Sequence, residues 1–222
     1  GGPRTTTETV AITVTPVNDD PLIVVPADVS LNEGPGATID VMGIGVSDVD
    51  FAESAATDLT VTLSIPSGEG TLTVDDTVGV TNIPDNGTVT VTLTGALDEI
   101  NATLAAGVAY LVPDGDFNGV VVLTVTTNDS GNTGTGGGAD VSQAMNIVVT
   151  AINDDPTIEA PAGIVNIQED SLLVFDAAGA NRIAVADVDL DETSGGLMMV
   201  KLEAPNGTLT LGATTGLVGL NG

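Results

Sequence analysis

Hydrophobic and polar residues alternate with a period of two along most of the chain. The segments VTVTLTG at 89–95 and VVVLTVTTND at 120–129 place Val or Leu at alternate positions, as in strands with one buried face. Turn-forming stretches such as SGEG, PDNG and NDSGNTGTGGG separate the alternating segments. The pattern predicts strands at 22–31, 37–46, 58–65, 70–75, 87–94, 107–112, 119–127 and 142–150.

One segment departs from the two-residue period. In GALDEINATLAAG at 95–107, Leu97, Ile100 and Leu104 are spaced as on one face of a helix, so a short helix is expected between strands. Many short strands at regular spacing are typical of a sandwich. The predicted fold class is therefore all-β, with tandem Greek-key β-sandwiches and one short helix per repeat.

The sequence contains an internal repeat. Four motifs each occur twice, at an offset that drifts only from 135 to 139 residues. The matching pairs are ITVTPVNDDP with IVVTAINDDP, VSLNEGPG with VNIQEDSL, SDVD with ADVD, and SGEGTLTV with APNGTLTL. We therefore predict the last strand of a preceding repeat at 1–16, a complete repeat at 17–151, and the first half of the next repeat at 152–222. Such a division is expected of a segment of a longer protein.

Composition and charge narrow the function. Val and Thr are abundant while aromatic residues make up 2% of the chain, which favours strands. The chain has 31 acidic residues and only three basic ones, Arg4, Arg182 and Lys201, so its net charge is −28. This charge argues against nucleic acid as a partner, because no basic surface is available to track phosphates. The acidic groups must be neutralised, tolerated in high salt, or used to hold cations.

Several kinds of chemistry lack the residues they need. The chain has no Cys and no His, which excludes disulfides, thiolate or imidazole catalysis and the usual zinc sites. No signal peptide and no membrane-spanning run is visible, so no membrane insertion is expected of this segment. Glycoside cleavage would need an aromatic-lined cleft, and the chain has one Tyr and three Phe. We therefore expect that it is not an enzyme.

The motifs together resemble a known family. They are VNDDP and INDDP between repeats, the Glu in LNEGPG and IQED, the DVD segments, LDEINATLAAGVAYLVPDGDFNG, and the strand ending VTTNDSG. In this set and order they resemble the cadherin-like, Ig-like tandem repeats of giant bacterial surface and adhesin proteins. The resemblance implies sandwiches strung end to end outside the cell, with Ca²⁺ at the junctions. Its implied partners are neighbouring repeats of the same protein and other copies in a polymer.

The resemblance also implies a set of calcium ligands. Glu33 matches the Glu at the end of the first strand, and Asp129 matches the acidic residue after the penultimate strand. The remaining matches are linker residues and the paired Asp residues of each repeat: Asn18, Asp19, Asp48, Asp50, Asn153, Asp154, Asp187 and Asp189. The linker nevertheless has Pro16 and Ala151 where cadherins begin with Asp.

Elementary coordination chemistry favours the same ion. Calcium takes six to eight oxygen ligands and tolerates irregular geometry. We expect Asp187 and Asp189 to alternate along a strand, with both carboxylates on one side. Because almost no Lys or Arg is present to pair such groups, they need a cation or remain in water. The alternative is that these Asp residues only form turns and caps, which Asp favours in any case.

DGDFNG at 114–119 opens like an EF-hand loop. Asp114, Asp116 and Asn118 occupy ligand spacings and Gly119 stands at position six, but Val125 replaces the bidentate Glu at position twelve. A predicted strand also follows where the EF-hand has a helix. We therefore favour a polar turn, and keep Asp114 and Asp116 as candidate metal ligands.

Three functional hypotheses result. The leading one is a calcium-stiffened spacer or filament module of a long extracellular surface protein. The second is an adhesive module that itself binds a glycan or a protein, which would need a concave, aromatic-lined site. The third and weakest is a fragment of a hydrolase, which an activity screen on polysaccharides would test.

Overall fold

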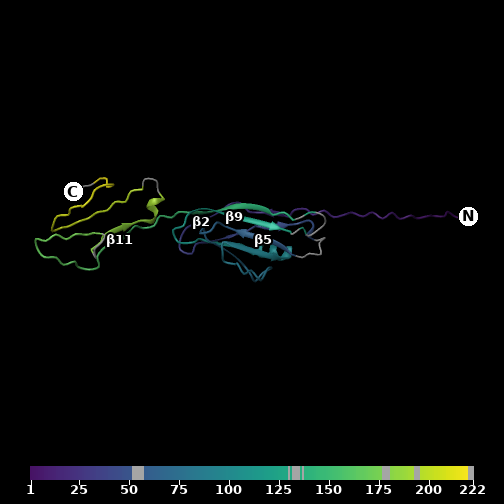
Figure 1. Ribbon diagram of the computed structural model, residues 1–222, viewed down its shortest axis with the longest axis horizontal. Coiled ribbons are helices and arrows are strands. Elements are labelled where there is room, and N and C mark those ends of the chain that lie inside the picture. Colours follow the sequence, from purple (N-terminus) through teal and green to yellow (C-terminus); the bar gives the residue numbers. More distant parts are fainter. Residues whose placement is uncertain are drawn as a thin grey trace. The chain divides into compact units, whose positions relative to one another are not determined.

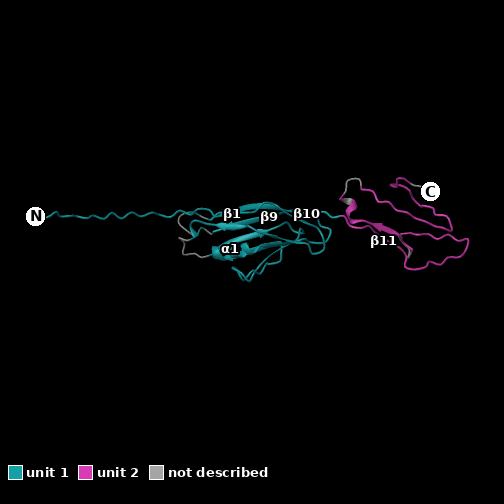
Figure 2. Cartoon of the chain, turned by 180° about the vertical axis from the view of Figure 1, so that it is seen from behind, with its two compact units in different colours: residues 1–152 teal, residues 153–222 magenta. Residues whose placement is uncertain are grey.

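The computed structural model describes residues 1–51, 58–129, 131, 136, 138–176, 181–192 and 196–219. The chain divides into two compact units, Gly1–Ile152 and Asn153–Gly222, coloured separately in Figure 2. In the described ranges, no helix combines the length and hydrophobicity that crossing a membrane requires.

Unit 1 is built from two principal sheets (Figure 1). In the five-stranded sheet all neighbours are antiparallel except the first pair, and its order is β2 (Val29–Asn32), β10 (Val141–Thr150), β9 (Gly119–Asn128), β5 (Leu59–Ser64), β7 (Thr90–Gly95). The antiparallel three-stranded sheet has the order β3 (Thr38–Val41), β8 (Val108–Leu111), β6 (Thr71–Val74). A further antiparallel pair joins β1 (Leu22–Val24) to β4 (Gly45–Ser47).

The two sheets share one hydrophobic core. Burial alternates along the central strands β5 and β9, as the two-residue period predicts. The fully buried Tyr110 of β8 packs in this core, and its hydroxyl donates to the main-chain oxygen of Glu69 at 2.7 Å. Burial of the hydroxyl is thus matched by a hydrogen bond. The prediction of an all-β sandwich with one short helix is confirmed for unit 1.

Two of the predicted strands are wrong in extent. The segment 22–31 forms β1 and β2, because the interruption contains Pro26, which has no N–H group for a ladder. The segment 37–46 forms β3 and β4, separated at Gly43, whose φ of 94° is unfavourable for other residues. Each break moves the chain from one sheet to another.

The predicted helix is confirmed as α1 (Leu97–Ala106). Ile100 and Leu104 are fully buried against the core. At its start the Glu99 side chain accepts a hydrogen bond from the Ala96 nitrogen at 3.3 Å, as in a capping box. Gly107 follows with a φ of 108°, and its nitrogen donates to the Leu104 oxygen at 3.1 Å.

Two asparagine side chains imitate strand partners. The Asn86 amide donates to the Val74 oxygen and accepts from the Val74 nitrogen, both at 2.9 Å. The Asn101 amide does the same with Val46, at 2.8 and 3.0 Å. Because unpaired strand edges invite pairing with other chains, these contacts protect β6 and β4.

Unit 2 contains β11 (Thr157–Glu159), β12 (Ala184–Ala186) and the 3₁₀ helix η2 (Val188–Asp191). The strands are antiparallel, and Thr157 pairs with Ala186 as Leu22 pairs with Ser47 in unit 1. The match of APNGTLTL to SGEGTLTV, which contains β6, predicts a strand at 207–211, but none forms there in the described part of unit 2, so this prediction is wrong. Without partner strands, alternation alone does not produce a ladder.

Candidate metal-binding site

In unit 1 the segment before β1 is bound to two acidic loops. The Asn18 amide donates to Asp129 Oδ2 at 2.8 Å, in the loop that follows β9. The Asp19 nitrogen donates to Asp50 Oδ2 at 2.5 Å, in the loop that follows β4. Asn18 thus meets a residue 111 positions further along the chain, and Asp19 meets one 31 positions further along. Both contacts lie at one end of unit 1.

These loops are shaped by aspartate turns. Asp48 Oδ1 accepts from the Asp50 nitrogen at 2.9 Å, and Asp129 Oδ1 accepts from the Gly131 nitrogen at 3.0 Å. Asp50 and Asp129 are nevertheless only 7% and 1% exposed. The turn role proposed as the alternative is thus real, but turn formation alone does not require a carboxylate to be buried.

Two contacts of the segment before β1 recur in unit 2. The Asn153 amide donates to the Asp154 oxygen at 3.0 Å, as Asn18 does to Asp19 at 3.3 Å. The Asp154 nitrogen donates to Asp189 Oδ2 at 2.5 Å, as Asp19 does to Asp50.

The expectation that Asp187 and Asp189 alternate along a strand is wrong. Asp187 Oδ1 accepts from the Asp189 nitrogen at 3.1 Å and caps η2, of which Asp189 is a part. An Asp two residues before a main-chain N–H group favours this local turn over a ladder. The two carboxylates are therefore gathered by a turn, not by a pleat.

A second acidic set lies at the other end of the long strands of unit 1. Glu33 follows β2 and is only 8% exposed. Its Oε1 accepts from the Ile152 nitrogen at 2.7 Å and its Oε2 from the Asn118 amide at 3.2 Å. Because β2 and β10 run parallel, the C-terminal ends of both strands lie side by side at this position. Here the Glu33 nitrogen also donates to the Thr150 oxygen at 3.0 Å.

The EF-hand-like segment forms a turn before β9. Asp114 Oδ1 accepts from the Asp116 nitrogen at 3.1 Å, and the Asn118 amide donates to the Asp116 oxygen at 3.4 Å. Asn118 also reaches Glu33, a contact that sequence reasoning missed. The sequence held a signal for this contact, because Asn118 directly precedes β9, the strand that pairs with β10. Asp114 and Asp116 remain candidate ligands beside this contact.

Glu33 and Asp129 accept hydrogen bonds from neutral amide groups. In the described part of the chain, the ion pairs join Arg182 to Glu159 at 3.3 Å and Lys201 to Glu203 at 2.5 Å, both inside unit 2. A buried carboxylate is costly unless hydrogen bonds or a cation offset the loss of water.

The donor set of unit 1 suits a hard cation, although it does not form a closed cage. Within unit 1 taken alone, the described carboxylates do not gather in threes within 4.8 Å. An ion at Asp129 and Asp50 would thus complete its six to eight ligands with amide and main-chain oxygens or water. Oxygen-only ligands of this kind suit calcium better than zinc, which takes nitrogen or sulfur.

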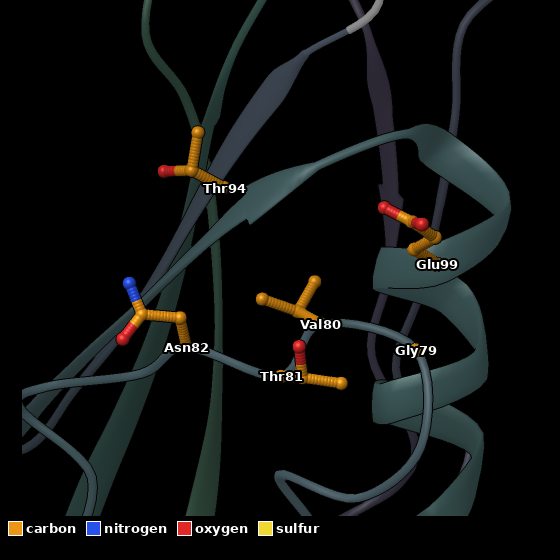
Figure 3. A pocket seen from close by; sticks show the side chains of 6 residues that line it. All are labelled: Gly79, Val80, Thr81, Asn82, Thr94 and Glu99. Carbon is orange, nitrogen blue, oxygen red and sulfur yellow. The ribbon is translucent and has the colours of Figure 1, made fainter.

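An open hollow of about 310 Å³ lies beside α1 (Figure 3). Gly79, Val80, Thr81, Asn82, Thr94 and Glu99 line it. Glu99 is already engaged in capping the helix, and the lining includes no aromatic side chain. The hollow therefore offers no aromatic stacking surface for a small molecule.

No protein-family model matches the chain, and no curated protein matches it either. Among solved structures, two partial matches are as follows. The collagen binding subdomain of the Enterococcus faecalis surface protein ACE is 12% identical, with a TM-score of 0.28, over 55% of this chain and 93% of that one. A non-cellulosomal cohesin from the hyperthermophilic archaeon Archaeoglobus fulgidus is 15% identical, with a TM-score of 0.28, over 59% and 92%. Likeness at this level carries no inference about function.

Proposed function

We propose that this chain is a calcium-stiffened structural module, a spacer or filament segment, of a long extracellular surface or adhesin-type protein. Its work is mechanical and not catalytic. The proposal treats 17–151 as one complete repeat and 152–222 as the beginning of the next.

One observation carries the proposal. At two places along the chain, the main chain of the linker between repeats (Asn18–Asp19 and Asn153–Asp154) donates a hydrogen bond to a buried or partly buried acidic loop. Asp19 is bonded to Asp50 in unit 1, and Asp154 is bonded to Asp189 in unit 2. The paired strands that follow keep the same register in both units. Recurrence of both contacts at matching positions supports a repeated device.

The charge of the chain supports calcium as the ion. Asp129 is almost fully buried and its hydrogen bonds come from the Asn18 amide and the Gly131 nitrogen. A divalent cation would offset the desolvation of such carboxylates and reduce the repulsion of a chain with a net charge of −28. Binding would couple the linker, through Asn18, to the loop after β9.

The testing experiment is a calcium titration of the whole chain by calorimetry, with melting curves in calcium and in chelator. A ligand that binds only the folded state raises the melting temperature, so calcium should raise it. Asp129→Asn should lower calcium affinity, whereas Asp75→Asn should not. Asp75 is the matched control, because it forms the same kind of turn with Thr77 but is exposed. Identical melting curves with and without calcium would refute the proposal.

A further inference from the structure

The five-stranded sheet of unit 1 carries no charge. None of the residues of β2, β10, β9, β5 and β7 is Asp, Glu, Lys or Arg, although the chain contains 31 acidic residues. The inward side chains of these strands form the core. An uncharged outer surface is therefore unusual for this chain and calls for a physical reason.

The outward side chains are mostly hydroxyls arranged in cross-strand rows. We define the hydroxyl face as the outward side chains of β7, β5, β9 and β10. Its central row is Thr92, Thr62, Thr126 and Ser142, each opposite the next in the ladder. Thr126 and Ser142 lie within hydrogen-bond distance at 2.9 Å. The parallel row on one side contains Thr94 and Thr60, whose hydroxyls are 3.5 Å apart.

The face also has an apolar end and a charged rim. On β9, Val120 and Val122 are 57% and 40% exposed. Two carboxylates lie just outside the strands: Asp28 accepts from Asn146, and Asp140 accepts from the Asn128 amide at 2.7 Å. Depletion of charged residues at the centre, with charged residues kept to the edge, is typical of protein interfaces.

We propose that the hydroxyl face is the surface through which two copies of this chain associate, face to face, through their units 1. Two chains of net charge −28 repel each other, so they can meet closely only where neither carries a charge. A hydroxyl both donates and accepts a hydrogen bond, so the face is complementary to itself, as a two-fold contact requires.

The size and stiffness of the face suit such a contact. Strands lie about 4.8 Å apart and residues about 3.3 Å apart, so the four strands of the face span about 19 Å and the ten residues of β9 span about 33 Å. A standard interface buries about 800 Å² per partner, so a contact over this face lies at the small end of that range, as suits a reversible dimer. Thr side chains are restricted at χ1, so docking orders them at little further entropic cost.

The association does not depend on calcium or on the proposed mechanical role, and sedimentation of the whole chain tests it. The wild-type chain should form a reversible dimer that strengthens with added salt, because salt screens the repulsion. Thr126→Glu should weaken the dimer about tenfold or more by burying a charge. Thr73→Glu, which adds the same charge at an exposed position of β6 in the other sheet, should not. Thr126→Val keeps the face neutral and should leave the dimer intact.

A cross-link identifies the face directly. The chain has no cysteine, so a single Thr126→Cys substitution introduces a unique thiol. On oxidation it should form a disulfide dimer, whereas Thr73→Cys should not. A wild-type chain that stays monomeric at all concentrations would overturn the proposal. So would a dimer that persists unchanged in Thr126→Glu, since its contact would lie elsewhere on the chain.

Discussion

The main-chain nitrogen of Asp19 lies 2.5 Å from Oδ2 of Asp50, so the segment before β1 is held by the loop after β4. Asp50 is itself held in place, because its nitrogen donates to Asp48. The linker is thus a bonded part of unit 1 and not a free tether. In unit 2 the nitrogen of Asp154 makes the same contact with Asp189.

Asp50→Ala should destabilise unit 1 even without calcium. The substitution removes the charged acceptor of the Asp19 nitrogen, and hydrogen bonds to charged groups contribute about 1.5–3 kcal/mol. Chemical denaturation in chelator measures the loss. Asp75→Ala is the control, since its carboxylate is exposed and binds only Thr77, and it should cost less than about 1 kcal/mol. Equal losses in the two variants would show that the linker contact has no special weight.

Gly70→Ala should be among the most damaging small substitutions in unit 1. A Cβ at Gly70 would lie 2.4 Å from the Leu111 oxygen and 2.6 Å from the Tyr110 ring, at a φ of 115°. Strained backbone and overpacking together are expected to cost about 3 kcal/mol or more. Gly68→Ala has a φ of 88° but open space, so only the backbone term of about 1 kcal/mol applies. Thermal denaturation of both variants should show this difference, and equal melting temperatures would contradict it.

Tyr110 gives a spectroscopic measure of core integrity. Burial, with a further contribution from the Glu69 carboxylate, raises the pKa of Tyr110 from 10.0 to about 12. The raised pKa means that this group stabilises the fold fully below pH 10, and that the contribution is lost as pH rises towards about 12. Because the chain has one Tyr and no Trp, its tyrosinate absorbance reports this group alone.

The absorbance titration should therefore have a midpoint well above 10 in the folded chain and near 10 in denaturant. Glu69→Gln should lower the folded midpoint, since it removes the nearby negative charge. A folded midpoint near 10 would mean that Tyr110 is accessible to water.

Protonation of Asp28 in acid should remove part of the stability of unit 1. The Asn146 nitrogen and side-chain amide both donate to its carboxylate at 2.9 Å, and these bonds lower the pKa of Asp28 below 3.8. A lowered pKa contributes stability above pH 3.8 that is lost as pH falls through the folded value. A carboxyl-carbon NMR titration should find a midpoint below 3.8. Asn146→Ala should raise it only in part, because the main-chain donor remains. A midpoint at or above 3.8 in the wild-type chain would contradict the contact.

The sequence pattern was sufficient for the elements of unit 1 but not for their limits. The two-residue alternation predicted the strands, and the spacing of Ile100 and Leu104 predicted α1. Both the strand period and the helix period arise from one buried face. The breaks at Pro26 and Gly43 lie inside alternating segments, where the pattern continues although the chain changes sheet. Periodicity records which face is buried and not which sheet buries it.

The candidate site could be anticipated in its residue types but not in its contacts. Asn18 and Asp129 are 111 positions apart, and no local pattern indicates that they share a hydrogen bond. The turn at Asp187 competes locally with the strand that alternation favours, and the turn prevails. Nothing local in the sequence indicates the contacts of Asn86 and Asn101, since these depend on strand edges that only the fold defines.

The most direct test of the account measures stiffness between the two units. Spin labels on Thr73→Cys in unit 1 and Thr208→Cys in unit 2 occupy exposed positions in a chain without other cysteines. If calcium stiffens the junction, the distance distribution should be narrow in calcium and broad in chelator. A control pair inside unit 1, Thr73→Cys with Thr94→Cys, should keep the same width in both conditions, which separates a loosened junction from unfolding. Equal widths for the inter-unit pair in calcium and in chelator would contradict calcium stiffening.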